Sequence, residues 1–165
     1  MDDKRISVNE LLNQKLQNWP DSLGDSIATV LRLHRTQGLL IDLLERSLDR
    51  HGLQTAEFEV MAALRRQPPP HQLTPTDLCG ALLLSSGGTT KVLQRLQRRD
   101  LIDRPTNPDD GRSCLVQLSD TGKQCIETVV EELVAIEDDA MQVLDTTEKA
   151  QLNQLLDKLL SAWGG

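Results

Sequence analysis

The sequence predicts a mainly α-helical protein that carries one short β-hairpin, and three observations support this fold class. Only three residues are aromatic, Trp19, Phe58 and Trp163, so the core must be built mostly from aliphatic side chains. Leucine, alanine, glutamine and glutamate are common, and these residues favour helices. Strand-like runs are scarce, and the clearest pair, residues 101–104 and 113–119, flanks a turn sequence, Asn107-Pro-Asp-Asp-Gly.

Helix start and stop signals give the order of the elements. Pro20 ends a first helix over residues 8–18, and Gly52 follows a long helix over residues 22–50. Thr55, Ser85 and Ser119 are each expected to cap a helix. The expected helices cover residues 8–18, 22–50, 56–67, 75–81, 85–99 and 119–141, and a last one runs from a capping-box-like start at Asp145 and Glu148 to about residue 163.

Length and composition bound the class of protein. A chain of 165 residues suits one domain. No run of 18 apolar residues is present, and the first five residues are not followed by the apolar stretch of a signal peptide, so we expect a cytoplasmic protein. The three histidines and the three cysteines, Cys79, Cys114 and Cys125, show no metal-ligand spacing. We therefore expect no disulfide framework, metal or cofactor.

Positive charge is concentrated in one segment. The net charge of −7 opposes binding to nucleic acid if it is taken as a sum. Residues 113–165 hold ten acidic and three basic groups, whereas residues 85–112 hold six basic and four acidic groups. Within residues 85–99, Lys91, Arg95, Arg98 and Arg99 are accompanied by no acid. Such a patch is typical of a DNA-contacting segment, although a helix with a solvated basic face has the same composition.

Residues 74–119 combine two helices and a hairpin. Thr74 suits an N-cap, Pro75 the first helical position, and Asp77 the positive end of the helix. Residues 82–84 form the turn before the second helix. On that helix one face, expected to be buried, holds Ser85, Gly88, Val92 and Leu96, and the opposite face holds Thr90, Lys91, Gln94 and Arg98. This order predicts a winged helix-turn-helix with a two-stranded β-wing, flanked by N- and C-terminal dimerisation helices, whose second helix enters the DNA major groove.

The wing and the helix start add further contacts. Arg112 begins the return strand of the hairpin, where an arginine can enter a narrow minor groove. Asp110 could orient Arg112 by a salt bridge, and a plain surface hairpin with an Asp–Arg pair is the alternative. Arg95 and Arg99 suit either phosphate contacts or ion pairs within the protein. The residues expected to contact DNA are Thr74, Ser85, Ser86, Thr89, Thr90, Lys91, Gln94, Arg95, Arg98 and Arg112, with Asp110 supporting the wing.

The terminal helices carry more apolar surface than a small core can cover. The last helix repeats Leu152, Leu155, Leu156, Leu159, Leu160 and Trp163 on one stripe. We expect one domain, 1–165, in which residues 1–50 and 123–165 form a helical dimerisation region and residues 55–122 a DNA-binding lobe. Two copies would read two half-sites. An intramolecular bundle of the same helices is the alternative.

The sequence bears on two other classes of protein. An enzyme is not expected, because the sequence has no phosphate-binding glycine loop, metal cluster or paired nucleophile and base. A winged-helix dimer that binds another protein instead of DNA is the second class, and the acidic surface permits it. Binding to duplex DNA that weakens steeply with salt and is lost in Arg112→Ala would separate the two.

The chain resembles the MarR family of bacterial transcription regulators over about residues 25–162. The matching pieces are Leu73-Thr-Pro-Thr-Asp-Leu78, Ser85-Ser-Gly-Gly88, Arg98-Arg-Asp-Leu-Ile102, Asp110-x-Arg112 and Leu118-Ser-x-x-Gly122. The resemblance implies an obligate homodimer that binds a pseudo-palindromic operator, usually as a repressor, and that is released by a small phenolic or aromatic effector or by oxidation. It also implies that Lys91 reads the major groove and that Arg112 enters the minor groove.

The N-terminal extension resembles that of urate-responsive members of the family. Those members use a tryptophan, an acid in the second helix and two arginines, and the matching positions here are Trp19, Glu59, Lys91 and Arg104. Glutamate and lysine stand where the pattern has aspartate and arginine, which argues against urate and leaves a different anionic aromatic ligand open. The interpretation that we prefer is that Trp19 anchors the extra helix by hydrophobic packing.

A cysteine switch is the remaining alternative for control. Peroxide-sensing members of the family carry a reactive cysteine near the start of the first long helix, and this chain has none there. Each of the three cysteines is expected to be a small buried apolar residue. A sensor would need an exposed thiol with a low pKa.

Overall fold

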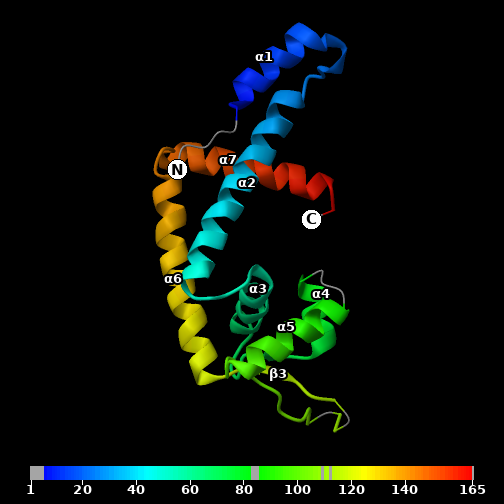
Figure 1. Cartoon of the computed structure of the whole chain (residues 1–165), viewed down its shortest axis with the longest axis vertical. Helices are drawn as coiled ribbons and strands as arrows, with labels where there is room; N and C mark the ends of the chain where they lie inside the picture. The colour runs from blue at the N-terminus through cyan, green and yellow to red at the C-terminus, as the bar shows by residue number, and fades with distance from the viewer. Residues whose placement is uncertain (1–5, 83–85, 109, 112, 165) are drawn as a thin grey trace. The chain divides into compact units, whose positions relative to one another are not determined.

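The computed structural model describes residues 6–82, 86–108, 110–111 and 113–164. These residues form mainly helices, joined to one small antiparallel sheet (Figure 1). The chain divides into two compact units, Met1–Arg46 and Ser47–Gly165. Among the described residues, no helix has both the length and the apolar character needed to cross a membrane.

The first unit holds α1 (Val8–Asn18), a 3-10 helix (Pro20–Ser22) and most of α2 (Ile27–Arg50). The bounds of α1 are those predicted, but α2 begins five residues later than predicted. The Ser22 hydroxyl donates to the Trp19 carbonyl at 2.7 Å and accepts from Lys15 Nζ at 2.9 Å, which holds the chain in a turn. Gly24 follows and disfavours a helix there.

The second unit contains α3 (Thr55–Arg65), α4 (Pro75–Leu82), α5 (Ser86–Arg98), α6 (Asp120–Met141) and α7 (Thr146–Ala162). The predicted cap of α6 is confirmed, because the Ser119 hydroxyl accepts from Gly122 N at 2.9 Å. The Asp145–Glu148 capping box is also confirmed. The predicted cap of α3 is wrong. Thr55 is its first helical residue and Gln54 is the N-cap, since Glu57 Oε2 accepts from Gln54 N at 2.9 Å.

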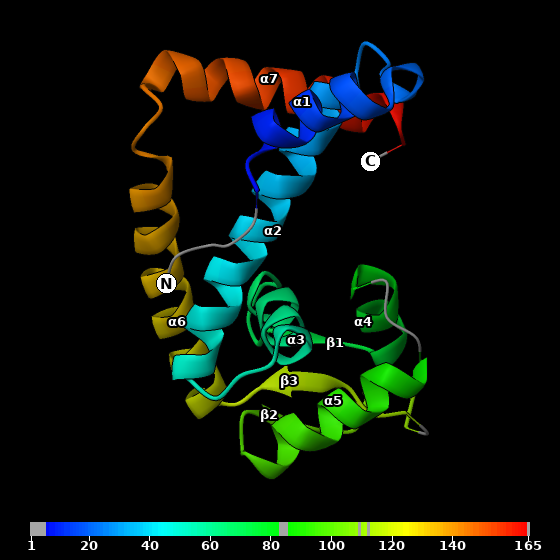
Figure 2. The same cartoon turned by 45° about the horizontal axis from the view of Figure 1, so that its top comes forward.

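The sheet has three strands and not only the two predicted for the wing. They are β1 (Gln72–Leu73), β2 (Ile102–Asp103) and β3 (Val116–Leu118), in the order β1-β3-β2. Gln117 is opposite Gln72 on one side and Asp103 on the other, and both pairings are antiparallel. Figure 2 shows the three strands side by side next to α3 and α5. The central strand β3 therefore joins the hairpin to the segment that leads into α4.

The core of the second unit lies where α3 packs against α4, α5, α6 and β3. Its largest fully buried side chains are aliphatic, as the scarcity of aromatic residues predicts. They include Leu48, Met61, Leu64, Leu78, Leu96, Ile102, Val116, Ile126 and Val129. The core therefore supports α4 and α5 from behind and leaves the opposite face of each helix exposed.

The start of α6 packs tightly on the corner between α5 and β2. The Ser119 hydroxyl donates to the Asp100 carbonyl at 2.6 Å, and Ser119 N donates to the Leu101 carbonyl at 3.3 Å. Gly122 is buried, and a Cβ added there would overlap the Leu101 carbonyl oxygen and lie 2.8 Å from its carbonyl carbon. The glycine of the Leu118-Ser-x-x-Gly122 motif therefore permits a close approach of two backbones.

Candidate nucleic-acid interface

Helix α4 is the first helix of the helix-turn-helix. Thr74 Oγ1 accepts from Asp77 N at 3.1 Å and donates to Asp77 Oδ2 at 2.7 Å, so Thr74 is the N-cap that the sequence predicts. Leu78 is buried, and α4 packs against both α3 and α5. Because the Thr74 hydroxyl already holds the helix start, a contact from this residue to DNA stays a prediction.

Helix α5 buries an apolar stripe composed of Val92, Leu93 and Leu96. Val92 and Leu96 were predicted on this face, but Gly88 is exposed and does not belong to it. The register differs because Thr89, one residue later, points inward and is 2% exposed. Ser85 lies outside the described residues, so its predicted cap is not described.

The opposite face of α5 presents polar and basic groups. Thr90, Lys91, Gln94 and Arg98 are all exposed. Arg98 Nε donates to the Gln94 carbonyl at 3.2 Å, which places its guanidinium along the helix surface. The side chain of Ser86 is outside the described part of the chain. The arrangement gives a face with hydroxyl, amide and cationic donors in consecutive turns of one helix.

Thr89 does not belong to that outward face. Its Oγ1 accepts a hydrogen bond from Cys79 Sγ of α4 at 3.3 Å. The buried hydroxyl therefore joins the two helices of the motif, and we leave Thr89 out of the proposed contacts with DNA. Sequence reasoning missed this because the inward rotation of residue 89 depends on how α4 and α5 pack.

Arg95 and Arg99 make ion pairs within the protein. Arg95 Nε lies 3.1 Å from Glu57 Oε1, and Arg99 Nη1 lies 3.5 Å from Glu57 Oε2. The Glu57 side chain is 3% exposed, whereas the arginines are 35% and 38% exposed. Sequence reasoning had left open the choice between phosphate contacts and ion pairs, and it did not identify Glu57.

The hairpin after β2 is closed by backbone and side-chain bonds. Thr106 and Cys114 form a β-bridge, Asn107 N donates to the Ser113 carbonyl at 2.9 Å, and Ser113 N donates to the Asp110 carbonyl at 2.9 Å. Asp110 is exposed. Arg112 lies outside the described residues, so the predicted Asp110–Arg112 pair is not described.

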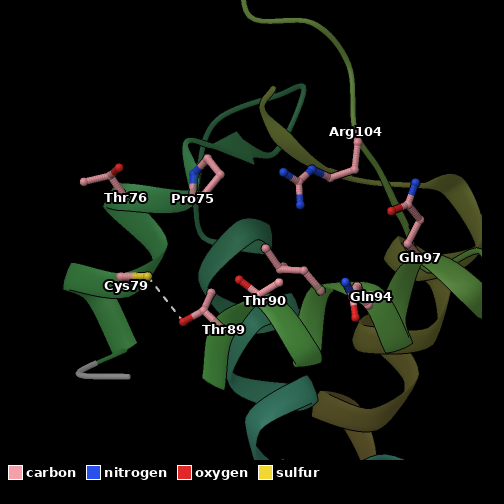
Figure 3. Close-up of a pocket in the computed structure, with 9 residues that line it drawn as sticks. Pro75, Thr76, Cys79, Thr89, Thr90, Gln94, Gln97 and Arg104 are labelled. Carbon is pink, nitrogen blue, oxygen red and sulfur yellow. Dashed lines mark hydrogen bonds between the residues drawn. The ribbon is translucent and has the colours of Figure 1, made fainter. Parts of the chain in front are cut away.

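A cleft of about 410 Å³ lies between α4, α5 and the chain that follows β2. Figure 3 shows Arg104 reaching over Thr90, with Pro75, Thr76 and Cys79 of α4 on one side and Gln94 and Gln97 of α5 on the other. Arg104 Nε is buried and has no hydrogen-bond partner among the residues that the structure describes. The cleft therefore offers a cationic donor beside threonine hydroxyls and two amides.

The four residues suggested for a ligand are not all in this cleft. Only Arg104 lines it, while Glu59 is half-buried on α3 and Lys91 is exposed on α5. Trp19 belongs to the first compact unit and is 63% exposed, with Lys15 Nζ 4.6 Å from its ring centroid. Among the described residues, no group of three or more His, Cys, Asp or Glu side chains could hold a metal ion.

Comparisons with known proteins agree with this geometry. Residues 51–113 match the sequence model of the MarR family. PecS of Dickeya dadantii, an HTH-type transcriptional regulator, is 29% identical over 154 residues, which are 93% of each chain. The transcriptional repressor MprA of Escherichia coli K12 is 26% identical over 161 residues, which cover 98% of this chain and 91% of MprA.

The multiple antibiotic resistance protein MarR of Escherichia coli K12 is 30% identical over 122 residues, which cover 72% of this chain and 81% of MarR. A crystal structure of a cysteine-to-serine mutant of MarR complexed with operator DNA matches with a TM-score of 0.65 and 27% identity, over 83% of this chain and 99% of that chain. These relatives are transcriptional regulators and not enzymes. The chain belongs to the MarR family of winged helix-turn-helix transcriptional regulators.

Proposed function

We propose that this regulator binds a pseudo-palindromic operator as a homodimer and represses transcription until a small effector releases it. The observation that carries the proposal is the outward face of α5, where Thr90, Lys91, Gln94 and Arg98 are exposed opposite the buried apolar stripe. Lysine, glutamine and threonine side chains match hydrogen-bonding groups on base edges in the major groove. Arg98 has the charge to contact a phosphate, which positions the helix without reading sequence.

The wing supplies the second contact in this proposal. Ser113 links the described residues of the hairpin, because its carbonyl accepts from Asn107 N and its N–H donates to the Asp110 carbonyl. Arg112 directly precedes Ser113 in the sequence and would enter the adjacent minor groove, where the negative potential is enhanced. Residues 55–122 would therefore act as the DNA-binding lobe.

A second copy of the chain would cover the apolar surface of the terminal helices. Helix α7 has no buried residue, and its apolar stripe stays open, with Trp163 74% exposed. A helix with such a stripe needs a partner surface. Other large apolar side chains exposed on α1, α2, α6 and α7 include Leu16, Val30, Leu39, Ile41, Val130, Val134, Leu155 and Leu160. Residues 1–50 and 123–165 would form the dimerisation region.

Two observations support repression with release by a small effector. MprA, a relative over almost the whole chain, is a transcriptional repressor. The cleft between α4 and α5 has the size of a small-ligand site, and Arg104 Nε has no partner there within the described part of the chain. An anionic aromatic or phenolic effector would pair with Arg104. It would press against the helix that carries Thr90 and Gln94, and so disturb their contact with DNA.

A thiol switch is less well supported than a ligand. Burial raises the pKa of the Cys125 thiol above its usual value, and the nearby positive charge of Arg99 offsets this only in part. A thiol with a raised pKa is a poor nucleophile at neutral pH. Cys79 donates a hydrogen bond to the buried Thr89, a structural role, and Cys114 is exposed on the hairpin.

Fluorescence anisotropy tests the proposed function directly. Purified protein is titrated into a duplex from upstream of its own coding region and into a random duplex of equal length, at two salt concentrations. Tighter, salt-sensitive binding to the upstream duplex is expected, because several cationic groups displace counterions. Equal or absent binding to both duplexes would refute the proposal and favour a winged-helix dimer that binds another protein.

A further inference from the structure

The buried carboxylate of Glu57 has partners at the start of its own helix, α3, and at the end of α5. Glu57 belongs to the first turn of α3, and its Oε2 accepts from Gln54 N at 2.9 Å. The remaining partners come from the end of α5 and the residue that follows it, namely Arg95 Nε at 3.1 Å from Oε1 and Arg99 Nη1 at 3.5 Å from Oε2. Because a buried charge needs full pairing, this carboxylate requires α5 to stay where it is.

Arg99 extends the same connection to the turn before α3. Its Nη1 donates to the Gly52 carbonyl at 2.8 Å, and its Nη2 donates to the His51 carbonyl at 3.3 Å. His51 in turn lies 3.0 Å from Glu132 Oε2 on α6. The guanidinium of Arg99 therefore has fixed protein partners and is not available as a separate phosphate contact.

Arg95 and Arg99 are four residues apart, about one helical turn, and Arg99 directly follows the last residue of α5. The apolar stripe of Val92, Leu93 and Leu96 fixes which side of α5 is buried. A charged hydrogen bond from Arg95 and an ion pair with Arg99, both to the Glu57 carboxylate, additionally fix the rotation of α5 about its axis and its position along that axis. Gln94 and Lys91, on the exposed face, take their direction from that rotation.

We propose that Glu57 is a positioning residue for sequence reading, which holds α5 through Arg95 and Arg99 in the orientation that presents Thr90, Lys91 and Gln94 to base edges. In this role Arg95 is a partner of Glu57 and not a phosphate clamp. The inference deepens the proposed function and rests on it, since it assigns specificity to a residue that does not touch DNA.

The test compares Glu57→Gln with Glu127→Gln in the full-length protein. Glutamine keeps the size of the side chain and an acceptor for Gln54 N, but removes the charge that holds the arginines. Glu127 is a matched control, because it pairs with Arg65 of the same helix α3 at 2.7 Å and is 45% exposed. Each protein is titrated with the upstream duplex and with a random duplex over a range of salt concentrations.

Glu57→Gln is expected to lower the ratio of upstream to random affinity about tenfold, the scale of one lost base contact. Affinity for the random duplex should stay the same or rise, because a released guanidinium can then reach phosphates. Glu127→Gln should leave both affinities unchanged. An unchanged ratio in Glu57→Gln would overturn the inference, and so would an equal loss on both duplexes by a protein that melts at the wild-type temperature.

Arg95→Gln keeps the inference testable if Glu57→Gln does not fold. If Arg95 positions α5, the variant should have a lower ratio of upstream to random affinity and an unchanged slope of log affinity against log salt. A phosphate clamp predicts equal losses on both duplexes and a slope smaller by about one, and that result would overturn the assignment.

A measurement without DNA separates this inference from the proposed function. Amide hydrogen exchange of the free protein should be faster along α5 in Glu57→Gln and Arg95→Gln and unchanged along α7. Exchange along α5 that matches wild type would overturn the positioning role. Failure of the wild type to prefer the upstream duplex, with α5 exchange altered in the variants, would refute the proposed function alone.

Discussion

Gly122→Ala should be strongly destabilising although it adds one methyl group to a helix. The new Cβ would overlap the Leu101 carbonyl oxygen and lie 2.8 Å from the carbonyl carbon. Both obstructing atoms are backbone, so no side chain can swing aside. The α5–β2 corner and the start of α6 must separate by roughly 1.5 Å before the contact becomes ordinary, and overpacking of this kind costs about 1–3 kcal/mol.

Two further contributions to the free energy of unfolding, from hydrogen bonds and from helix propensity, nearly cancel. Separation would weaken the bonds of Ser119 to the Asp100 and Leu101 carbonyls, and a hydrogen bond contributes about 1 kcal/mol. Alanine recovers at most about 1 kcal/mol over glycine through its helix propensity. We expect a net loss of about 2–3 kcal/mol, near the upper end of the overpacking range because the obstructing groups are rigid. The melting temperature should fall by roughly 5–10 °C.

Thermal unfolding followed by circular dichroism measures this loss, at one protein concentration because association shifts the midpoint. Gly80→Ala is the matched control, since Gly80 is also helical and a Cβ added there has nothing within 4 Å. The control should melt at or slightly above the wild-type temperature. If Gly122→Ala melts like Gly80→Ala, the two backbones do not approach as closely as described.

Three further outcomes are expected. Lys91→Ala should weaken the binding free energy for the upstream duplex by about 1–3 kcal/mol and that for a random duplex by less, and Lys158→Ala of α7 is the control. Equal losses on the two duplexes would make Lys91 a phosphate contact only. Deletion of residues 150–165 should give a monomer in analytical ultracentrifugation, because it removes most of α7, and a dimeric product would contradict the pairing of terminal helices. Iodoacetamide at pH 8 should label Cys125 more slowly than the exposed Cys114, because burial raises the Cys125 pKa and only the thiolate reacts; equal rates would contradict the raised pKa.

Local signals in the sequence were sufficient for most of the helical fold. Ser119 and the Asp145–Glu148 pair cap the helices as predicted, because a cap depends on residues only three positions apart. Pro20 likewise predicts the end of α1. The exposed position of Lys91 follows from a single helical periodicity and needs no knowledge of neighbouring elements.

Features that depend on tertiary packing were not predictable in the same way. Strand β1 is two residues long and forms only because Val116 and Gln117 of β3 are placed beside it. Thr89 turns inward to meet Cys79 of α4, a contact between residues of different helices. Glu57 gave only a local signal, the third residue after an N-cap, while its partners Arg95 and Arg99 are about forty positions away in the sequence.

The shared strand β3 has a consequence for how such regulators diverge. It pairs with both β1 and β2, and the hairpin continues to a bridge between Thr106 and Cys114, so residues 107–113 of the sequence connect its two sides and form its tip. Insertions or deletions in this tip leave the strand register intact. An insertion or deletion of one residue within β3 would instead turn the side chains that now face the core to the opposite face of the sheet. Related proteins can therefore differ in the length and sequence of this tip. The preference for DNA that flanks the major-groove site can change in this way while the orientation of α5 stays the same.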